Sequence, residues 1–195
     1  MAKKIMVICG SPRENGNTSN IVKWFRESAC EAGAEVEIID AAKLKYKNYG
    51  CIACMGCQHS DKYECVIEDE ATPILARIPD MDVLVLATPV YFFGPSAQIK
   101  VFGDRMFSLF KFVPEKEIFL HNLEGKTLAL IASGGSDMSS GLSNIESICK
   151  TMAKFTCMDY KSLLIPFAPR EEGAITDKTD IKEKAINFGK ELSAG

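Results

Sequence analysis

Long apolar stretches are missing from this sequence. None approaches the roughly 20 consecutive apolar residues that a transmembrane helix needs. The apolar run after Lys3 and Lys4 ends at Cys9, short of the apolar core of about 7–15 residues in a signal peptide, and a glycine turn follows it in place of a cleavage site. We therefore expect a cytoplasmic protein that has no membrane partner.

A surplus of charge of either sign is missing as well. The chain carries 23 lysines and arginines against 26 aspartates and glutamates, a formal net charge of -3. Such a balance provides no general electrostatic attraction to nucleic acid or to an acidic membrane surface. We therefore expect no nucleic-acid partner.

Histidine is scarce, and the motifs of several enzyme classes do not occur. His59 and His121 are the only histidines and there is no GxSxG elbow, which disfavours a serine hydrolase. His121 lies in a polar connection, where we expect it to contact solvent. The lack of GxxxxGKS/T disfavours nucleotide triphosphate hydrolysis, and the lack of GxGxxG disfavours a Rossmann-type NAD site.

Apolar segments alternate between a strand period and a helix period, which is typical of an α/β fold with a parallel sheet. We predict strands at residues 4–9, 35–39, 82–88, 127–132 and 160–165. We predict helices at residues 18–32, 96–113, 140–156 and 178–193, and one more before the third strand. With 195 residues, 47% of them hydrophobic, the chain is expected to form a single domain over residues 1–195.

The turn after the first strand is rich in groups that bind phosphate. A helix N-terminus presents free N–H groups and a partial positive charge. Ser11, Arg13, Gly16, Asn17 and Thr18 lie in this turn, where the arginine can add a charge-assisted hydrogen bond. Because the triphosphate and dinucleotide motifs are missing, a monophosphate such as that of FMN is indicated. The alternative is an ordinary turn in which Asn17 or Thr18 only caps the helix.

Two further turns follow strands at the same edge of the predicted sheet. The aromatic and backbone groups of residues 88–96 suit a flat isoalloxazine ring, although the aromatic side chains could instead form a core or interface cluster, and Ser96 could cap the next helix. Ser133, Gly134 and Gly135 follow the fourth strand, where glycines would let backbone approach the ring. The alternative for these glycines is a plain turn.

Four of the eight cysteines are closely spaced in an irregular loop at about residues 45–68, and a loop of this length is usually functional. Cys51, Cys54, Cys57 and Cys65 follow the pattern C-x2-C-x2-C-x7-C, whose two-residue spacings let thiolates converge on one 4Fe-4S cluster. A zinc site completed by Cys65 or His59, disulfides in an aerobic sample, and a loop without metal are the alternatives, since spacing alone does not choose the metal. Cys9, Cys30, Cys149 and Cys157 are interpreted as structural.

The GSPRENGNT turn, the segment ATPVYFFGPSAQIKVFGDR at residues 87–105 and the cysteine loop resemble the NADPH-dependent FMN reductase family, and within it the iron-sulfur flavoprotein branch. The resemblance implies a flavodoxin-like three-layer sandwich, α/β in class, with a five-stranded parallel sheet of order 2-1-3-4-5. It also implies bound FMN, with Pro89, Val90, Tyr91 and Phe92 at the ring. In the helix predicted at residues 96–113, we expect Lys100, Asp104 and Arg105 to be exposed, with Asp104 and Arg105 forming an ion pair.

The resulting hypothesis is an FMN-dependent oxidoreductase that passes electrons from NAD(P)H through flavin, and through a 4Fe-4S cluster where one is bound, to a redox partner protein or a small-molecule acceptor. Because flavin carries the chemistry, no catalytic residue is named. An electron carrier without a nicotinamide reaction and a metal- or thiol-based redox sensor are the alternatives. The resemblance also implies a homodimer or homotetramer in which the cysteine loop faces a neighbour's FMN. An aromatic-rich set agrees with an interface, unless it fills the core: Phe92, Phe93, Phe107, Phe110 and Phe112.

Overall fold

The computed structural model describes residues 2–194 and has a parallel β-sheet at its centre. The strand order is β2-β1-β3-β7-β8, which confirms the flavodoxin-like order 2-1-3-4-5. Each strand lies within two or three residues of its predicted bounds. The strands are β1 (Lys4–Cys9), β2 (Glu35–Asp40), β3 (Val83–Tyr91), β7 (Thr127–Ser133) and β8 (Asp159–Ile165).

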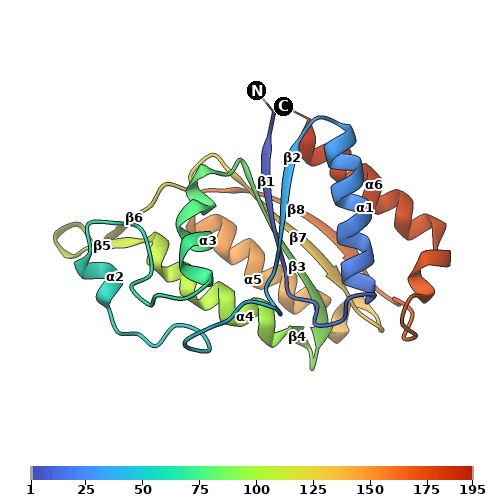
Figure 1. Ribbon diagram of the computed structural model, residues 1–195, viewed down its shortest axis with the longest axis horizontal. Helices are drawn as coiled ribbons and strands as arrows, with labels where there is room; N and C mark the ends of the chain where they lie inside the picture. The colour runs from blue at the N-terminus through green and yellow to red at the C-terminus, as the bar shows by residue number, and fades with distance from the viewer. Residues whose placement is uncertain (1, 195) are drawn as a thin grey trace.

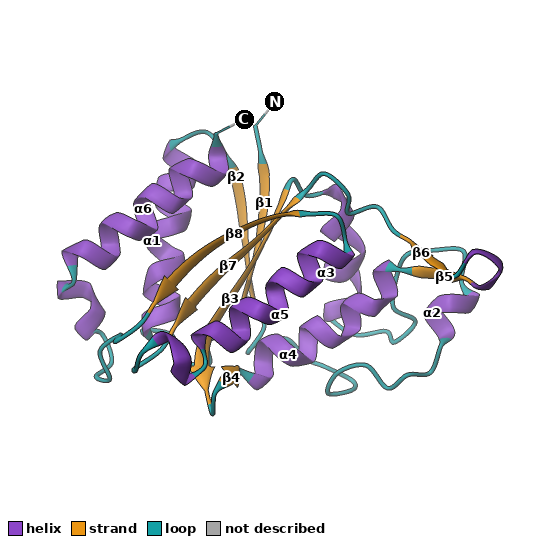
Figure 2. Cartoon of the chain, turned by 180° about the vertical axis from the view of Figure 1, so that it is seen from behind, coloured by secondary structure: helices purple, strands orange, loops and turns teal. Residues whose placement is uncertain are grey.

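Helices cover both faces of this sheet, so the molecule has three layers (Figure 1). On one face lie α1 (Asn17–Glu31) and α6 (Thr179–Ser193), and on the other lie α3 (Ala71–Arg77), α4 (Ala97–Asp104) and α5 (Leu142–Phe155), as the reverse view also shows (Figure 2). Each face has its own buried apolar core. Because both faces are covered, the central strands are apolar along nearly their whole length, which is why they could be recognised in the sequence.

The two helices of the first layer pack closely because α6 contains a glycine at the contact. A Cβ atom at Gly189 would lie 2.5 Å from the carbonyl oxygen of Phe25 and 2.1 Å from Oγ of Ser28. Both of these α1 residues are buried. The glycine therefore costs helix propensity but permits an approach that no side chain allows.

The predicted helix at residues 96–113 is wrong in its second half. After α4 the chain forms a 3-10 segment, η2 (Arg105–Leu109), and then a short antiparallel hairpin of β5 (Lys111–Val113) and β6 (Ile118–Leu120). Pro114 disfavours helical backbone at the residue before it, which explains part of the change. The side chain of Gln58 explains the rest, because it donates to the carbonyl of Phe110 and accepts from the N–H of Phe112.

The remaining elements are short. The bounds are α2 (Gly56–His59) in the cysteine loop, β4 (Gly94–Pro95), and the 3-10 segments η1 (Ile78–Asp80), η3 (Pro114–Lys116), η4 (Met138–Ser140) and η5 (Ala174–Asp177). In both ribbon views α2 and the hairpin lie at the end of the molecule opposite α1 and α6 (Figures 1 and 2). The two ends of the described chain lie side by side, and Lys3 Nζ donates to the carbonyl of Ala194 at 2.6 Å. Over residues 2–194, no helix has both the length and the apolar character needed to cross a membrane.

Candidate functional site

A pocket of about 220 Å³ opens at the carboxyl edge of the sheet, where doubly wound folds bind ligands. The carboxyl ends of β3 and β7 and the segments that follow β1, β7 and β8 supply its walls. Every residue predicted for the cofactor lines this pocket except Phe92. The lining residues are Ser11, Arg13, Gly16, Asn17, Thr18, Pro89, Val90, Tyr91, Ser133, Gly134, Gly135, Ala168, Pro169 and Arg170.

The N-terminus of α1 faces this pocket without a side-chain cap. Gly16 is the N-cap residue, and among residues 2–194 no side chain bonds to the first N–H groups of the helix as a cap. Ser11 and Ser19 instead donate to the carbonyl of Arg13, at 3.1 and 2.7 Å, and so shape the turn. A Cβ on Gly16 would lie 3.0 Å from Cβ of Arg13. The turn thus leaves backbone donors and the positive end of the helix dipole free for an anion.

Asn17 and Thr18 link this turn to two others. Asn17 Nδ2 donates to the carbonyl of Pro169 at 2.7 Å, and Thr18 Oγ1 shares a buried hydrogen bond of 2.8 Å with Ser133 Oγ. The alternative in which one of these side chains caps α1 is therefore wrong. Their role is to fix the relative positions of the turns that follow β1, β7 and β8.

The charge at the pocket rim is positive. Arg13 and Arg170 are both exposed and both line the pocket. Within the described chain, the one ion pair of Arg13 is a 3.8 Å contact with Glu172, between side chains 45% and 51% exposed. A pair this long and this exposed contributes little free energy, so the Arg13 guanidinium is available to a bound anion.

The turn after β3 is a tight hairpin with an unusual backbone. Tyr91 pairs with Gly94 of β4, and between them Phe92 and Phe93 both have positive φ, 45° and 65°. Positive φ at both central residues is the requirement of a type I′ turn, which normally selects Asn and Gly. Phe92 is 96% exposed and lies outside the pocket, unlike the three residues before it.

Ser96 and Gly134 explain how the turns approach one another. Ser96 caps α4 by accepting from the N–H of Ile99 at 3.4 Å, as expected, and also donates to the carbonyl of Gly10 at 2.6 Å. Gly134 lies against the carboxyl end of β3, where a Cβ atom on the glycine would be 3.1 Å from Cγ2 of Val90. The glycine therefore serves a close backbone approach and is more than a plain turn residue.

The sequence analysis missed Ala168, Pro169 and Arg170, which follow β8 at the pocket. Their segment lacks the polar cluster and the paired glycines that marked the other turns. The sheet topology offered a signal, because the end of every parallel strand reaches the same edge. Arg170 is the useful addition, since it brings a second cation to the rim.

The cysteine loop encloses a second cavity of about 270 Å³, and all four predicted ligands line it together. Cys57 is buried, Cys65 is half-buried, and Cys51 and Cys54 are exposed. His59 does not line the cavity. In the described part of the chain, no three Cys, His, Asp or Glu side chains lie close enough together to hold a metal ion.

The expectation of an exposed Asp104–Arg105 ion pair is wrong. The Arg105 side chain is 0% exposed and pairs with Asp69, whose side chain is 4% exposed, through Nη1 at 2.7 and 2.5 Å from the two carboxylate oxygens. Nη2 donates to the carbonyl of Ile67 at 3.0 Å and to Oγ1 of Thr72 at 2.8 Å. Asp104 pairs with Lys100 instead, and that pair is exposed as expected.

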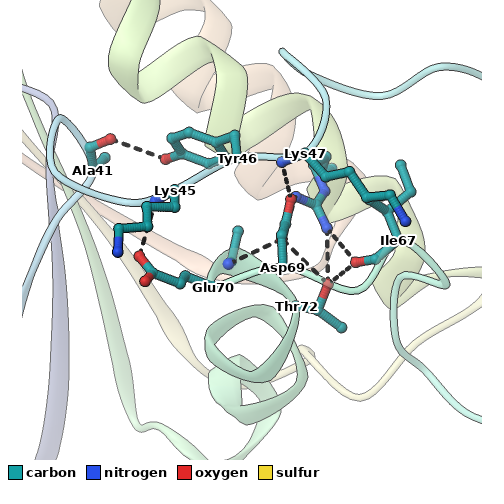
Figure 3. A network of polar contacts seen from close by, with 10 residues as sticks. Ala41, Lys45, Tyr46, Lys47, Ile67, Asp69, Glu70 and Thr72 are labelled. Atoms are coloured by element: carbon teal, nitrogen blue, oxygen red, sulfur yellow. Dashed lines mark hydrogen bonds and ion pairs between the residues drawn. The ribbon is translucent and has the colours of Figure 1, made fainter.

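Asp69 connects the two ends of the cysteine loop through hydrogen bonds. It accepts hydrogen bonds from the N–H groups of Lys47 and Ala71, at 3.0 and 3.1 Å (Figure 3). Burial by itself would raise the pKa of Asp69, but the hydrogen bonds and the charge of Arg105 outweigh it, so the pKa is lowered. Burial would lower the pKa of Arg105, but the hydrogen bonds and the charge of Asp69, together with the nearby Cys65, raise it. Both groups are therefore charged in the folded protein.

Comparison with known proteins identifies relatives that carry iron-sulfur and flavin names. An iron-sulfur flavoprotein of Methanocaldococcus jannaschii is 38% identical over 102 residues, which cover 52% of this chain and 51% of the relative. An iron-sulfur flavoprotein of Methanosarcina thermophila is 32% identical over 145 residues, which cover 74% and 70%. The first alignment thus spans about half the length of the relative that it matches.

Solved structures share the fold at lower identity. An NAD(P)H:quinone oxidoreductase from Methanothermobacter marburgensis superposes with a TM-score of 0.74 at 13% identity, covering 100% of this chain and 99% of the other. An FMN-dependent NADH-azoreductase from Bacillus anthracis, in complex with FMN, gives 0.70 at 16%, covering 98% and 97%. The sequence model of the NADPH-dependent FMN reductases matches residues 3–162, and the chain therefore belongs to that family.

Proposed function

We propose that this chain is an FMN-dependent oxidoreductase that takes electrons from NAD(P)H and passes them to an acceptor. The observation that carries the proposal is the pocket at the carboxyl edge of the sheet, where the uncapped N-terminus of α1 meets a cationic rim. Family membership supports the choice of FMN as the ligand. Bound there, FMN would supply hydride acceptance and single-electron release, which protein side chains do not.

The residues of the pocket divide between the two ends of such a ligand. The first N–H groups of α1, the Ser11 hydroxyl and the Arg13 guanidinium suit a phosphate monoester, which is a compact dianion. Residues 89–91 and the backbone at Gly134 suit a flat ring, because Pro89 and Val90 are apolar and Gly134 adds no side chain beside Val90. The buried hydrogen bond between Thr18 and Ser133 joins the side of the pocket that suits the phosphate to the side that suits the ring.

The cysteine cavity supports a second redox group, a 4Fe-4S cluster held by Cys51, Cys54, Cys57 and Cys65. The donor set is right for iron, because four thiolates are the usual ligands of such a cluster. Over residues 2–194 no three of these side chains converge as the ligands of a single ion would, but each thiolate of a cluster binds a different iron atom and so lies farther from the others. All four thiol-bearing residues line one cavity, and the similar proteins bear the words iron-sulfur in their names. Zinc could use the same thiols and is separated from iron by metal analysis.

The positions of the two sites support assembly as a homodimer or homotetramer. The cysteine loop runs away from the pocket toward α2, which lies at the opposite end of the molecule from α1, whose N-terminus lines the pocket (Figure 1). Phe92 and Phe93 are 96% and 61% exposed, whereas Phe110 is buried, so the aromatic segment serves both surface and core. A second copy could bring its cysteine loop to this pocket. Light scattering gives the oligomeric state. A monomer in which reduced flavin still passes electrons to the cluster would contradict this arrangement.

NADPH or NADH mixed anaerobically with the FMN-loaded protein is expected to bleach the flavin absorption within the turnover time. Stopped-flow spectrophotometry measures this directly. The electron-carrier alternative predicts no bleaching by either nucleotide, followed by full bleaching on addition of dithionite. Purification without any FMN, combined with no uptake of added FMN, would instead favour the redox-sensor alternative.

Arg13→Ala is expected to weaken FMN binding by about 1.5–3 kcal/mol, roughly 10- to 150-fold in Kd, because a charge-assisted hydrogen bond to phosphate is lost. Fluorescence titration gives the affinity. Arg26→Ala is the matched control, since Arg26 is an exposed arginine on α1, the helix that follows the turn of Arg13, and does not line the pocket. Equal affinities of the two variants would remove Arg13 from the site. Riboflavin, which lacks the phosphate, should bind both variants alike.

A further inference from the structure

Two polar atoms at the cysteine cavity are buried and have no partner. Over residues 2–194, the buried side-chain nitrogen and oxygen atoms without a hydrogen bond are Nε of Arg105, Oγ of Ser108 and the hydroxyl of Tyr160. Arg105 and Ser108 both line the cavity that the four cysteines surround, and Tyr160 does not. An unpaired buried donor destabilises a folded protein, so such atoms call for an explanation.

The local backbone aims both donors at the same side. Arg105 and Ser108 are three residues apart in the 3-10 segment η2, and side chains at that spacing lie above one another in a 3-10 helix. The rest of the guanidinium cannot turn away, since Nη1 and Nη2 are held by Asp69, Ile67 and Thr72. The Nε–H group is thus the one Arg105 donor left over, and it is fixed in place.

The cavity has the character of a site for sulfur that carries negative charge. No carboxylate lines it, and Arg105 and Ser108 bring the only side-chain N–H and O–H groups among its described lining residues. The other walls are the four cysteines and mostly apolar side chains. Cys65 lines this cavity together with Arg105 and Ser108. A thiolate or sulfide here would satisfy both orphaned donors.

We propose that Arg105 Nε and Ser108 Oγ donate hydrogen bonds to the sulfur atoms of the iron-sulfur cluster, and so hold the cluster and raise its reduction potential. This inference rests on the proposed function, which assigns the cluster to the cysteine cavity. Hydrogen bonds to sulfur and nearby positive charge both favour the reduced, more negative cluster. The two residues are positioning residues, because they act on the cluster through its sulfur atoms.

The proposal gives Ser108→Ala opposite effects on the two forms of the protein. Without metal, the variant loses only a hydroxyl that has no partner, so the melting temperature should be unchanged or higher. With the cluster bound, the variant should have a more negative cluster potential. It should also release iron to a chelator roughly tenfold faster, the effect typical of removing a group that orients a metal ligand.

Tyr160→Phe is the matched control, because it removes the other hydroxyl without a partner, which lies outside the cavity. Its metal-free form should behave like Ser108→Ala, and its loaded form like the unmodified protein. Arg105→Lys is the second variant. It keeps a charge for Asp69 but has no Nε–H fork, so it should lower the cluster potential and speed iron release as well.

The experiment is anaerobic reconstitution with iron and sulfide, followed by a redox titration with EPR detection and by chelator-driven iron release. The FMN potential in the same titration is the internal reference. The proposal is overturned if Ser108→Ala and Arg105→Lys match Tyr160→Phe in both measurements. It is also overturned if the unmodified protein binds no iron, an outcome that leaves flavin reduction by NAD(P)H standing as a separate result.

Discussion

Asp69→Ala is expected to lower the free energy of unfolding by about 3–5 kcal/mol, the usual cost of removing one partner from a buried ion pair. The variant leaves the Arg105 guanidinium 0% exposed with no carboxylate beside it, and an arginine cannot escape the cost by losing its proton. It also removes the acceptor for the N–H groups of Lys47 and Ala71. Urea unfolding followed by circular dichroism measures the loss.

Asp104→Ala is the matched control for this variant. Asp104 precedes Arg105 in the chain and pairs with Lys100. These two side chains are 39% and 60% exposed, so the loss in free energy of unfolding should be at most about 1 kcal/mol. Adding Arg105→Met to Asp69→Ala should restore most of the stability, because the double variant leaves no unpaired charge. Equal losses from Asp69→Ala and Asp104→Ala would show that the buried pair has no special role.

The same pair fixes the sign of a pH effect. The pKa of Asp69 is lower in the folded protein than in the unfolded chain, where it is about 3.9. Its contribution to stability is therefore complete above about pH 4 and is lost as the pH falls through the folded value. The difference in stability between the unmodified protein and Asp69→Ala should shrink over that acidic range and stay constant above it.

The second large effect is expected from Cys57→Ala, which should lose most of the iron that anaerobic reconstitution delivers. The unmodified protein should take up about four irons per chain, the content of one 4Fe-4S cluster. Cys57 is the one buried member of the four cavity cysteines, and its backbone is held in place by Lys111. Iron and sulfide analysis with the visible absorption spectrum gives the content.

Cys149→Ala is the control, since Cys149 is also buried but lies on α5, outside the cysteine cavity. Its iron content should equal that of the unmodified protein. FMN content should be the same in both variants, because neither residue lines the pocket at the carboxyl edge. Uptake of stoichiometric zinc and no iron by the unmodified protein would show that the cavity is a zinc site and that the cluster prediction is wrong.

The parallel strands and the phosphate turn could be predicted because their signals are local. A strand covered on both faces is apolar throughout, and the turn that follows β1 has a fixed place in any doubly wound sheet. The set of polar residues from Ser11 to Thr18 therefore indicates both a position and a type of ligand. Their assignment to FMN remains a prediction that the Arg13 variant tests.

Arg105 shows why the rest could not be predicted. Its partner, Asp69, lies 36 residues earlier in the chain, and the helical spacing around Arg105 matches that of an exposed residue. Nothing in the local pattern marks the end of α4, since apolar residues continue at helical intervals into the hairpin. Gln58 of the cysteine loop contacts the hairpin, and the partner of Arg105 lies just after that loop, which has no period of its own. Burial of a charge by a distant segment leaves no local signature.

The adjacent ends of the described chain have a practical consequence. Lys3 meets Ala194 at the edge of the sheet where β1 begins, and the pocket opens at the edge where β1 ends. An affinity tag or a surface linker placed at either end would therefore lie at the opposite edge of the sheet from the pocket. Tethered to an electrode in this way, the protein would present this pocket to the solution, so that electron exchange between FMN bound there and soluble donors could be recorded as current.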